Sequence, residues 1–536
     1  MAHMAAPTKY AEGPIRLFTS PRPSTVVKTP LSILDATCAR FSDTSAVWLF
    51  EAPSSGKVDD AFVAKLKTSF IETLNAFPQW AGQLHWAPFR EGGHHTERFN
   101  RSMVTYGSEA DPGVEWTVVR HDYEITSFAL KTAESFSSEG LWDAGDAFPQ
   151  RDLVSPTRLA LYNLRDFQGI PAMSVQISLF SCGGYGVGVR LAHQLGDAQS
   201  MMVFMHKWAA NSRTIFTGGQ PSQSLFDEPV FDPQQLDSRA AGDIDGEAAD
   251  ETIAETARTL PLHRFSWWDT DEPGYSPWLV ASSKNSIPPA EVLAKTNVSP
   301  STLAPWKTWD LARPVSWGLV HFTGDELLGL QRAAREGIPE SAVLSRTDAL
   351  MAYLFRTITR ARSRVHVGDR DEPVYLNVSI DCRRRVARPL PETFLGSPLL
   401  MTHIGAASPA VCEATLGDLA LRLRNTLTAF TPDGLAAVLH DAAHEVSPQR
   451  LWLGFMGSRH LIATSWQRLR AYDVDFEGGG KGPAYVHPVM EKCDGIVVVA
   501  DSLVRNGGVD ASLYLDAEAW VHFKEELSRK SESIAG

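Results

Sequence analysis

Two side chains four residues apart, His193 and Asp197, are the strongest candidates for chemistry in this sequence. They follow an alternating stretch around Gln176 that predicts a strand, and a glycine-rich stretch at Cys182–Gly188 that predicts a second strand with little side chain. Apolar residues at helical spacing begin at Met201 and predict a helix. A histidine between such a strand and a helix can lie in a cleft, where a neutral imidazole can act as a general base.

Other roles for these residues stay open at this point. A single histidine beside an apolar strand is more often a hydrogen-bonded structural residue, and His-x-x-x-Asp occurs by chance in many proteins. Cys182 is close to His193 in sequence and is a second candidate nucleophile, although no neighbour that would activate its thiol can be identified. The five cysteines are scattered without Cys-x-x-Cys spacing, so we expect neither disulfides nor a metal site.

The composition is that of an ordinary globular protein. The chain has 536 residues, of which 43% are hydrophobic and 21% are charged, so it is long enough for two or more domains. Its net charge of −13 argues against nucleic acid or an anionic membrane as a partner. Because no apolar run has the length of a membrane span and no signal-peptide pattern opens the sequence, we expect a cytoplasmic protein.

The elements predicted along the chain divide it into three regions. Residues 1–216 are expected to form an N-terminal domain that contains His193, and residues 306–536 a C-terminal domain of alternating strands and helices. Residues 217–305 are rich in Gly, Pro, Ser and acidic residues, which predicts an interdomain crossover, mobile over 217–256. We assign its acidic run no function. In the C-terminal domain a long helix is expected to begin with Ser345 or Thr347 as its N-cap.

Several motifs around His193 occur in an order that is characteristic of one family. They are Phe180-x-Cys-Gly-Gly with His193-x-x-x-Asp197, the helix at Ser345-x-x-Asp348, the strand end Asp381-Cys382-Arg383, the turn Phe394-Leu395-Gly396-Ser397, and Thr464-Ser465-Trp466. From Leu31 to Phe523 the chain therefore resembles the BAHD acyltransferases, which are CoA-dependent enzymes of plant and fungal specialised metabolism. The long acidic insert and an altered loop near the C-terminus are more typical of the fungal branch.

The sequence departs from the family pattern at three positions. Gln83 stands where an arginine is usual, and Ser397 replaces an asparagine. The family's Asp-Phe-Gly-Trp-Gly-Lys-Pro becomes a longer loop, Asp475 to Pro483, which lacks the tryptophan and contains three consecutive glycines. We therefore expect this loop to be less firmly packed and more flexible.

The resemblance implies an α/β (α+β) fold of two similar chloramphenicol-acetyltransferase-like domains, each a mixed β-sheet packed with helices. It makes His193 the base, in a tunnel at the domain interface, and makes acyl-CoA a co-substrate without a permanently bound cofactor or metal ion. Asp197 would support the site by pairing with an arginine, for which Arg383, Arg384 and Arg385 are all candidates. The expected ligand contacts are Thr464 and Trp466 for the acceptor, and Arg383, Arg384, Ser397 and Lys481 for CoA.

These observations predict an O-acyltransferase that moves an acyl group, by default acetyl, from acyl-CoA to a hydroxyl or amine of a small natural product. The acceptor would attack directly without an acyl-enzyme, and we expect a monomer. One alternative keeps the fold but uses a carrier-bound donor or catalyses an intramolecular cyclisation; another is a non-enzymatic binding protein. A peptide-synthetase condensation domain fits less well, because Ala192 replaces its usual second histidine and Ala198 its following glycine.

Overall fold

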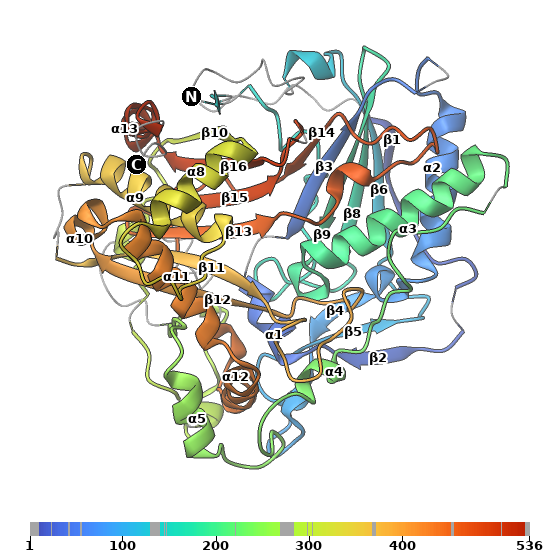
Figure 1. Cartoon of the computed structure of the whole chain (residues 1–536). Coiled ribbons are helices and arrows are strands. Elements are labelled where there is room, and N and C mark those ends of the chain that lie inside the picture. The colour runs from blue at the N-terminus through green and yellow to red at the C-terminus, as the bar shows by residue number, and fades with distance from the viewer. Residues whose placement is uncertain are drawn as a thin grey trace.

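Two large mixed sheets lie side by side, each covered by helices (Figure 1). The computed structural model describes residues 10–530 except 23, 41–42, 54–55, 129–139, 144, 146, 220, 269–283, 297, 303, 367–370, 452–454 and 505. The fold class predicted from the sequence, two domains of mixed sheet packed with helices, is confirmed by this arrangement.

The first sheet contains the strand that leads to His193. In spatial order its strands are β1 (Tyr10–Leu17), β6 (Val114–Arg120), β8 (Met173–Leu179), β9 (Tyr185–Leu191), β3 (Thr44–Phe50) and β14 (Tyr485–Pro488). Only β6 and β8 among these neighbours run parallel. Two helices, α2 (Asp60–Leu74) and α3 (Ala198–Phe216), pack on each other and share an apolar core with this sheet.

The second sheet positions the residues that face His193. Its order is β12 (Leu399–Ala407), β11 (Pro373–Asp381), β13 (His460–Trp466), β15 (Ile496–Asp501), β16 (Val509–Asp516), β10 (Val315–Phe322) and β7 (Leu141–Trp142). It shares a separate core with α8 (Gly324–Arg335), α9 (Arg346–Ser363), α11 (Leu416–Ala429) and α13 (Ala517–Leu527), and α10 (Ser408–Glu413) packs beside α9. A small third sheet consists of β2 (Val27–Pro30), β5 (Ser102–Tyr106) and β4 (Gln83–Trp86).

Two strands cross the domain boundaries predicted from the sequence. β14, which is close to the C-terminus, pairs with β3 of the first sheet (Figure 1). β7, from the N-terminal region, pairs with β10 of the second sheet. Each half of the chain thus completes the sheet of the other half. The two domains are joined by backbone hydrogen bonds as well as by side-chain packing.

The crossover contains ordered helices rather than a purely mobile connection. In the part of the crossover that the structure describes, the helices are α4 (Gln234–Asp237), α5 (Glu251–Arg258) and α7 (Ala290–Leu293). Helix α5 begins at its N-cap Asp250 and packs on α12 (Pro432–His444), burying Ala254 and Ala257. In α5 the acidic residues Glu251 and Glu255 are exposed, while the small apolar residues face a helix that is distant along the chain.

Candidate functional site

His193 lies between the end of β9 and the start of α3, in a short 3-10 helix, His193–Leu195. The strand before it needs glycine at position 188, because a Cβ atom there would lie 2.1 Å from the carbonyl oxygen of Leu153. Glycine thus lets the segment around Leu153 cover β9. The glycine in this strand therefore allows the close contact between β9 and Leu153, five residues before His193.

The partner of the His193 ring comes from the other domain. The Nδ1 atom of His193 lies 3.0 Å from the hydroxyl oxygen of Ser397, and the same hydroxyl donates to the main-chain carbonyl of His193. Because a serine hydroxyl has a single proton, it must accept the proton of Nδ1 while it donates to the carbonyl. The imidazole is then held with Nδ1 protonated and its lone pair on Nε2, as a general base requires.

The surroundings of His193 favour its neutral form. The ring is half-buried, and this burial lowers the pKa of His193 below its ordinary value, although the charge of Asp197 acts in the opposite direction. A histidine with a lowered pKa is unprotonated at neutral pH. It can therefore take a proton from a substrate hydroxyl without first losing one of its own.

Asp197 forms a buried ion pair with Arg383 and does not act as a simple partner of His193. The two guanidinium nitrogens of Arg383 donate to the two carboxylate oxygens of Asp197, at 2.7 and 2.9 Å. Asp197 also caps α3 by accepting from the backbone N–H of Ser200 at 2.9 Å. This bidentate pair joins the first turn of α3 to the end of β11, and so fixes the two domains around His193.

Arg383 and Ser397 were both expected to bind CoA, and the structure gives them other neighbours. Arg383 is 1% exposed and its guanidinium also donates to the carbonyl of Phe394 and to Asp381, while Ser397 is fully buried against His193. Neither side chain can reach a phosphate in solvent without giving up these contacts. For both residues these contacts favour a role in positioning the site over the predicted role in CoA binding.

Two further groups of the site were not singled out from the sequence. Gly396 adopts a φ of 128°, a conformation that favours glycine, and its carbonyl accepts from the backbone N–H of Asp197 at 3.1 Å. The buried carboxylate of Asp35 accepts from the backbone N–H of Ser397 at 2.6 Å and from Ser32. Burial raises the pKa of Asp35 to about 7. The capping box Ser32-x-x-Asp35 at the start of α1 (Ile33–Thr37) was the sequence signal for this residue.

Thr464 and Arg384 share a cavity of about 330 Å³ beside β11 and β13. Thr464 accepts from the Ser379 hydroxyl at 3.4 Å, and Arg384 has a side chain 80% exposed. Asp381 also lines this cavity and lies 3.1 Å from Arg383, which connects the cavity wall to the ion pair under His193. The third candidate arginine, Arg385, donates to the carbonyl of Leu427.

Trp466 and Lys481 lie apart from that cavity wall. Trp466 is buried, 5% exposed, and belongs to the apolar core that α3 shares with the first sheet. Lys481 is exposed and follows Gly478, whose Cβ position lies 3.0 Å from Thr217 at the end of α3. Because α3 has 19 residues and a length of about 28 Å, Lys481 is far from Arg384 at the other end. The two cations predicted to bind CoA do not form one phosphate site.

The altered loop is anchored despite its missing tryptophan. Phe476 is 1% exposed and contacts Trp208 of α3 with ring centroids 4.8 Å apart. The side chain of Asp475 accepts from three backbone N–H groups of the loop, those of Glu477, Gly478 and Gly480, at 2.8–3.0 Å. An aromatic anchor and an aspartate turn thus replace the packing that we expected to be lost.

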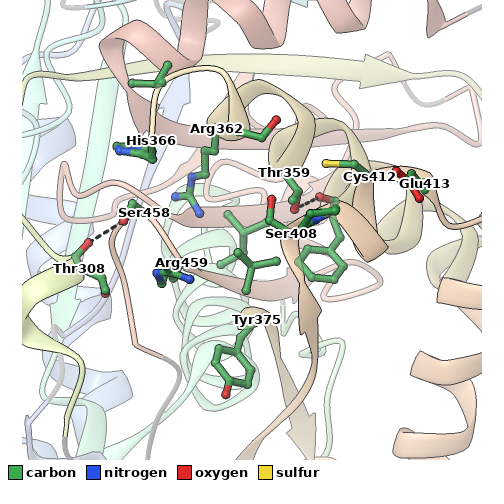
Figure 2. A pocket seen from close by; sticks show the side chains of 16 residues that line it. Thr308, Thr359, Arg362, His366, Tyr375, Ser408, Cys412, Glu413, Ser458 and Arg459 are labelled. Carbon is green, nitrogen blue, oxygen red and sulfur yellow. Dashed lines mark hydrogen bonds between the residues drawn. The ribbon is translucent and has the colours of Figure 1, made fainter. Parts of the chain in front are cut away.

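A larger cavity, of about 560 Å³, lies at the opposite end of α9 from Asp348, and His193 does not line it. Figure 2 shows the side chains around it. Arg362, His366 and Arg459 line it, and burial lowers the pKa of His366. Arg362 pairs with Asp494 at 2.6 Å, and Arg459 pairs with Glu372 at 3.0 Å. Judged by volume alone, this cavity would be the candidate active site, but none of the residues that surround His193 lines it.

Comparisons with known proteins agree with this geometry. The family described as the Transferase family matches residues 146–258 and 322–530, which are more than half of the chain. The chain belongs to this family, the BAHD acyltransferases. It is therefore an acyltransferase.

Acyltransferase AFT15-1 of Alternaria alternata is 25% identical over 490 residues, covering 89% of this chain and 88% of the relative. Acyltransferase abl6 of Leptosphaeria maculans is 25% identical over 476 residues, covering 88% and 86%.

Solved structures of this acyltransferase family share the fold. TRI101 of F. sporotrichioides, in complex with coenzyme A and T-2, has a TM-score of 0.61 at 19% identity and covers 94% of this chain and 98% of its own. Vinorine synthase has a TM-score of 0.58 at 18% identity, with coverage of 97% and 98%. The chloramphenicol-acetyltransferase-like architecture is thereby shown. Within the described residues, every helix is too short or too polar to span a lipid bilayer.

Proposed function

We propose that this acyltransferase moves an acyl group, with acetyl as the first candidate, from acyl-CoA to a hydroxyl or amine of a small natural product. His193 is the general base, and the acceptor attacks the thioester without an acyl-enzyme intermediate. Solved neighbours that contain coenzyme A together with T-2 mycotoxin or deoxynivalenol support both the donor and the acceptor class.

In the proposed reaction, Nε2 of His193 first accepts a proton and later donates it. Nε2 of His193 accepts the proton of the acceptor hydroxyl while the hydroxyl oxygen forms a bond to the thioester carbonyl carbon. The tetrahedral intermediate then breaks its carbon–sulfur bond, and the leaving thiolate of CoA takes the proton back from Nε2. The ester and free CoA are the products, and the imidazole returns to its neutral form.

The contact between His193 and Ser397 is the observation that carries this proposal. Ser397 leaves Nε2 as the basic nitrogen, and Asp35 holds the backbone N–H of Ser397 in place. The ion pair of Asp197 and Arg383 keeps the turn before α3 against the second domain. Catalysis of this kind depends on such positioning, because a base contributes about 10²–10⁴-fold only when it is within hydrogen-bond reach of its proton.

The cavity beside β11 and β13 is the proposed entrance of the donor. Thr464 and Ser379 offer hydroxyl groups along its wall, and Arg384 offers an exposed guanidinium for the phosphates of CoA. Trp466, which was expected to contact the acceptor, is buried in the apolar core of the first sheet and does not line this cavity. Lys481 is too remote from Arg384 to bind the same phosphate group.

Calorimetric titration of CoA and acetyl-CoA tests the donor assignment. Wild-type protein and Arg384→Ala are compared, with Arg165→Ala as a matched exposed arginine outside the cavity. We expect saturable binding to the wild type, a weaker affinity for Arg384→Ala, and no change for Arg165→Ala. Absence of binding to a folded wild-type sample would contradict CoA dependence and favour a carrier-bound donor or an intramolecular reaction.

A further inference from the structure

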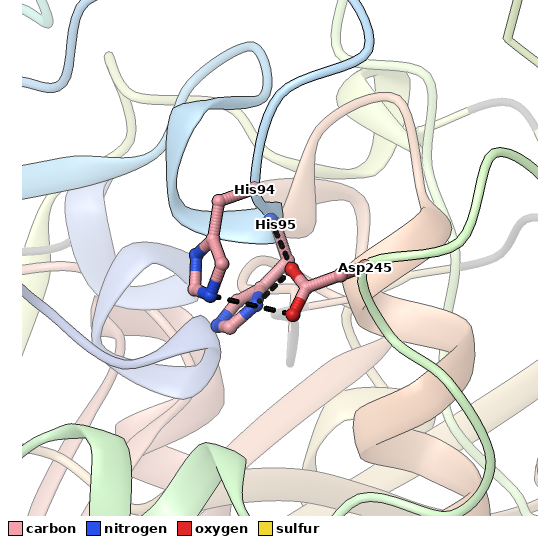
Figure 3. A group of neighbouring side chains, drawn as sticks. All are labelled: His94, His95 and Asp245. Atoms are coloured by element: carbon pink, nitrogen blue, oxygen red, sulfur yellow. Dashed lines mark hydrogen bonds and ion pairs between the residues drawn. The ribbon is translucent and has the colours of Figure 1, made fainter.

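A cluster of metal-ligating side chains lies outside the acyltransferase site, where the loop after β4 meets the crossover. His94, His95 and Asp245 each offer one ligand atom, and these atoms all lie within 4.8 Å of one another (Figure 3). The two imidazole rings lie side by side, with centroids 4.2 Å apart, and both point toward the carboxylate. Their side chains bond to one another, to Thr96 and to Asp237, and not to His193 or to the ion pair of Asp197 and Arg383.

The spacing of these atoms is close to that around a tetrahedral ion. The Nε2 atom of His94 lies 3.3 Å from one oxygen of Asp245, and the Nδ1 atom of His95 lies 2.9 Å from the other. Bonds of about 2.0–2.1 Å at tetrahedral angles separate neighbouring ligand atoms by about 3.3 Å. The side chain of His94 is 45% exposed, so its ring can rotate to close the remaining gap to His95.

The second nitrogen of His95 already has a partner of the kind that orients metal ligands. Nε2 of His95 lies 3.1 Å from the carboxylate of Asp237, which is only 1% exposed. Nδ1 of His94 accepts from the backbone N–H of Thr96 at 3.4 Å and lies 2.9 Å from the hydroxyl of the same residue. When a metal ion takes the lone pairs of His95 Nδ1 and His94 Nε2, Nε2 of His95 is protonated and donates to Asp237, and Nδ1 of His94 is protonated and donates to the Thr96 hydroxyl in place of accepting the N–H. A buried carboxylate behind a histidine is the typical arrangement of a histidine–metal site.

The oxygens of Asp245 face the two histidines. One of them accepts from the backbone N–H of His95 at 2.8 Å, and the two oxygens lie 3.3 and 2.9 Å from the ring nitrogens of His94 and His95. Two guanidinium groups near the cluster bond to main-chain carbonyls: Arg98 donates to those of Ala443 and Gly246, and Arg101 donates to that of His95. Both oxygens of Asp245 stay directed toward the histidines.

We propose that His94, His95 and Asp245 bind a divalent transition metal ion of the Zn²⁺ type, with Asp237 as the group that orients His95. Two imidazole nitrogens and one carboxylate oxygen suit Zn²⁺ and Co²⁺ better than Mg²⁺ or Ca²⁺, which prefer oxygen ligands alone. Water completes the coordination, because His94 and Asp245 face solvent. The ion clips the loop at His95 to the crossover at Asp245, 150 residues away.

Titration of the full-length protein with ZnCl₂, followed by calorimetry, and with CoCl₂, followed by visible absorption, tests this site. We expect one saturable Zn²⁺ site per chain and an intense tetrahedral Co²⁺ spectrum in the wild type. Both signals should be lost in His94→Ala and Asp245→Asn, and Asp237→Asn should bind about 10–100-fold more weakly. A higher unfolding temperature with Zn²⁺ should accompany binding and disappear in the same variants.

His522 provides the matched control, because it is a surface histidine paired with a carboxylate, Glu525, at 3.3 Å. His522→Ala should bind Zn²⁺ as the wild type does. Variants at half-exposed His94 and Asp245 are used in place of one at buried His95, whose loss could unfold the loop. Equal binding by His94→Ala and the wild type, loss of binding only in His522→Ala, or no saturable binding at all would overturn the proposal.

Discussion

The substitution Asp197→Asn separates the structural role of this residue from a catalytic one. An asparagine keeps the size of the side chain and one acceptor oxygen, so it can still cap α3. It removes the negative charge that faces both guanidinium nitrogens of Arg383, which are 2.7 and 2.9 Å from the carboxylate oxygens. Because Arg383 is 1% exposed, the substitution leaves its positive charge buried with Asp381 as the remaining carboxylate partner.

Breaking a buried pair in this way costs about 3–5 kcal/mol of unfolding free energy. Asp381→Asn is the matched control, because Asp381 contacts the same guanidinium at 3.1 Å but is 49% exposed, so its loss should cost about 0–1 kcal/mol. Urea unfolding followed by circular dichroism compares the two variants with the wild type. An unchanged unfolding midpoint for Asp197→Asn, together with a large loss of kcat, would refute the structural account and make Asp197 a catalytic residue.

Three further outcomes follow from the structure. Ser397→Ala should lower kcat by up to about tenfold, the worth of one hydrogen bond, with an unchanged KM for acetyl-CoA in steady-state assays. A higher KM with an unchanged kcat would contradict the positioning role. Burial lowers the pKa of His263 to about 3 and of His403 to about 4, so the folded state binds fewer protons than the unfolded state below about pH 6.5. The free energy of unfolding should therefore fall by up to about 1.4 kcal/mol per histidine for each pH unit below 6.5, and equal urea midpoints at pH 7.5 and 5.5 would contradict this. Phe476→Ala should cost about 3–5 kcal/mol, measured by the same unfolding assay, whereas a midpoint equal to that of the wild type would show that the loop is not anchored by this ring.

Elements with strong local patterns could be predicted from the sequence. Helix α9 begins after Ser345, one of the two N-cap candidates, whose side chain accepts from the backbone N–H of Asp348. β11 also ends at Asp381, where the sequence predicted the end of a strand. In each case the information lies within a few neighbouring residues, which is the range over which hydrogen bonds and periodicity act.

The partners of the site residues depend on contacts that are distant in sequence. The hydroxyl of Ser397 meets the ring of His193 across 204 residues, and the turn that brings it there contains Gly396 with a φ of 128°. Sequence reasoning identified the Ser-for-Asn difference but could not assign its neighbour. It also grouped Lys481 with Arg384, because a motif gives order along the chain and not separation in space.

The rate of thiol release from acetyl-CoA is the most direct test of His193 as the base. It is measured with a panel of hydroxylated acceptors that includes T-2 and deoxynivalenol, for the wild type, His193→Ala and Cys182→Ser, since Cys182 is the exposed alternative nucleophile. The account predicts a loss of about 10²–10⁴-fold in kcat for His193→Ala, with CoA affinity retained, and wild-type rates for Cys182→Ser. A His193→Ala variant that keeps the wild-type rate, or a Cys182→Ser variant that loses it, would contradict the account.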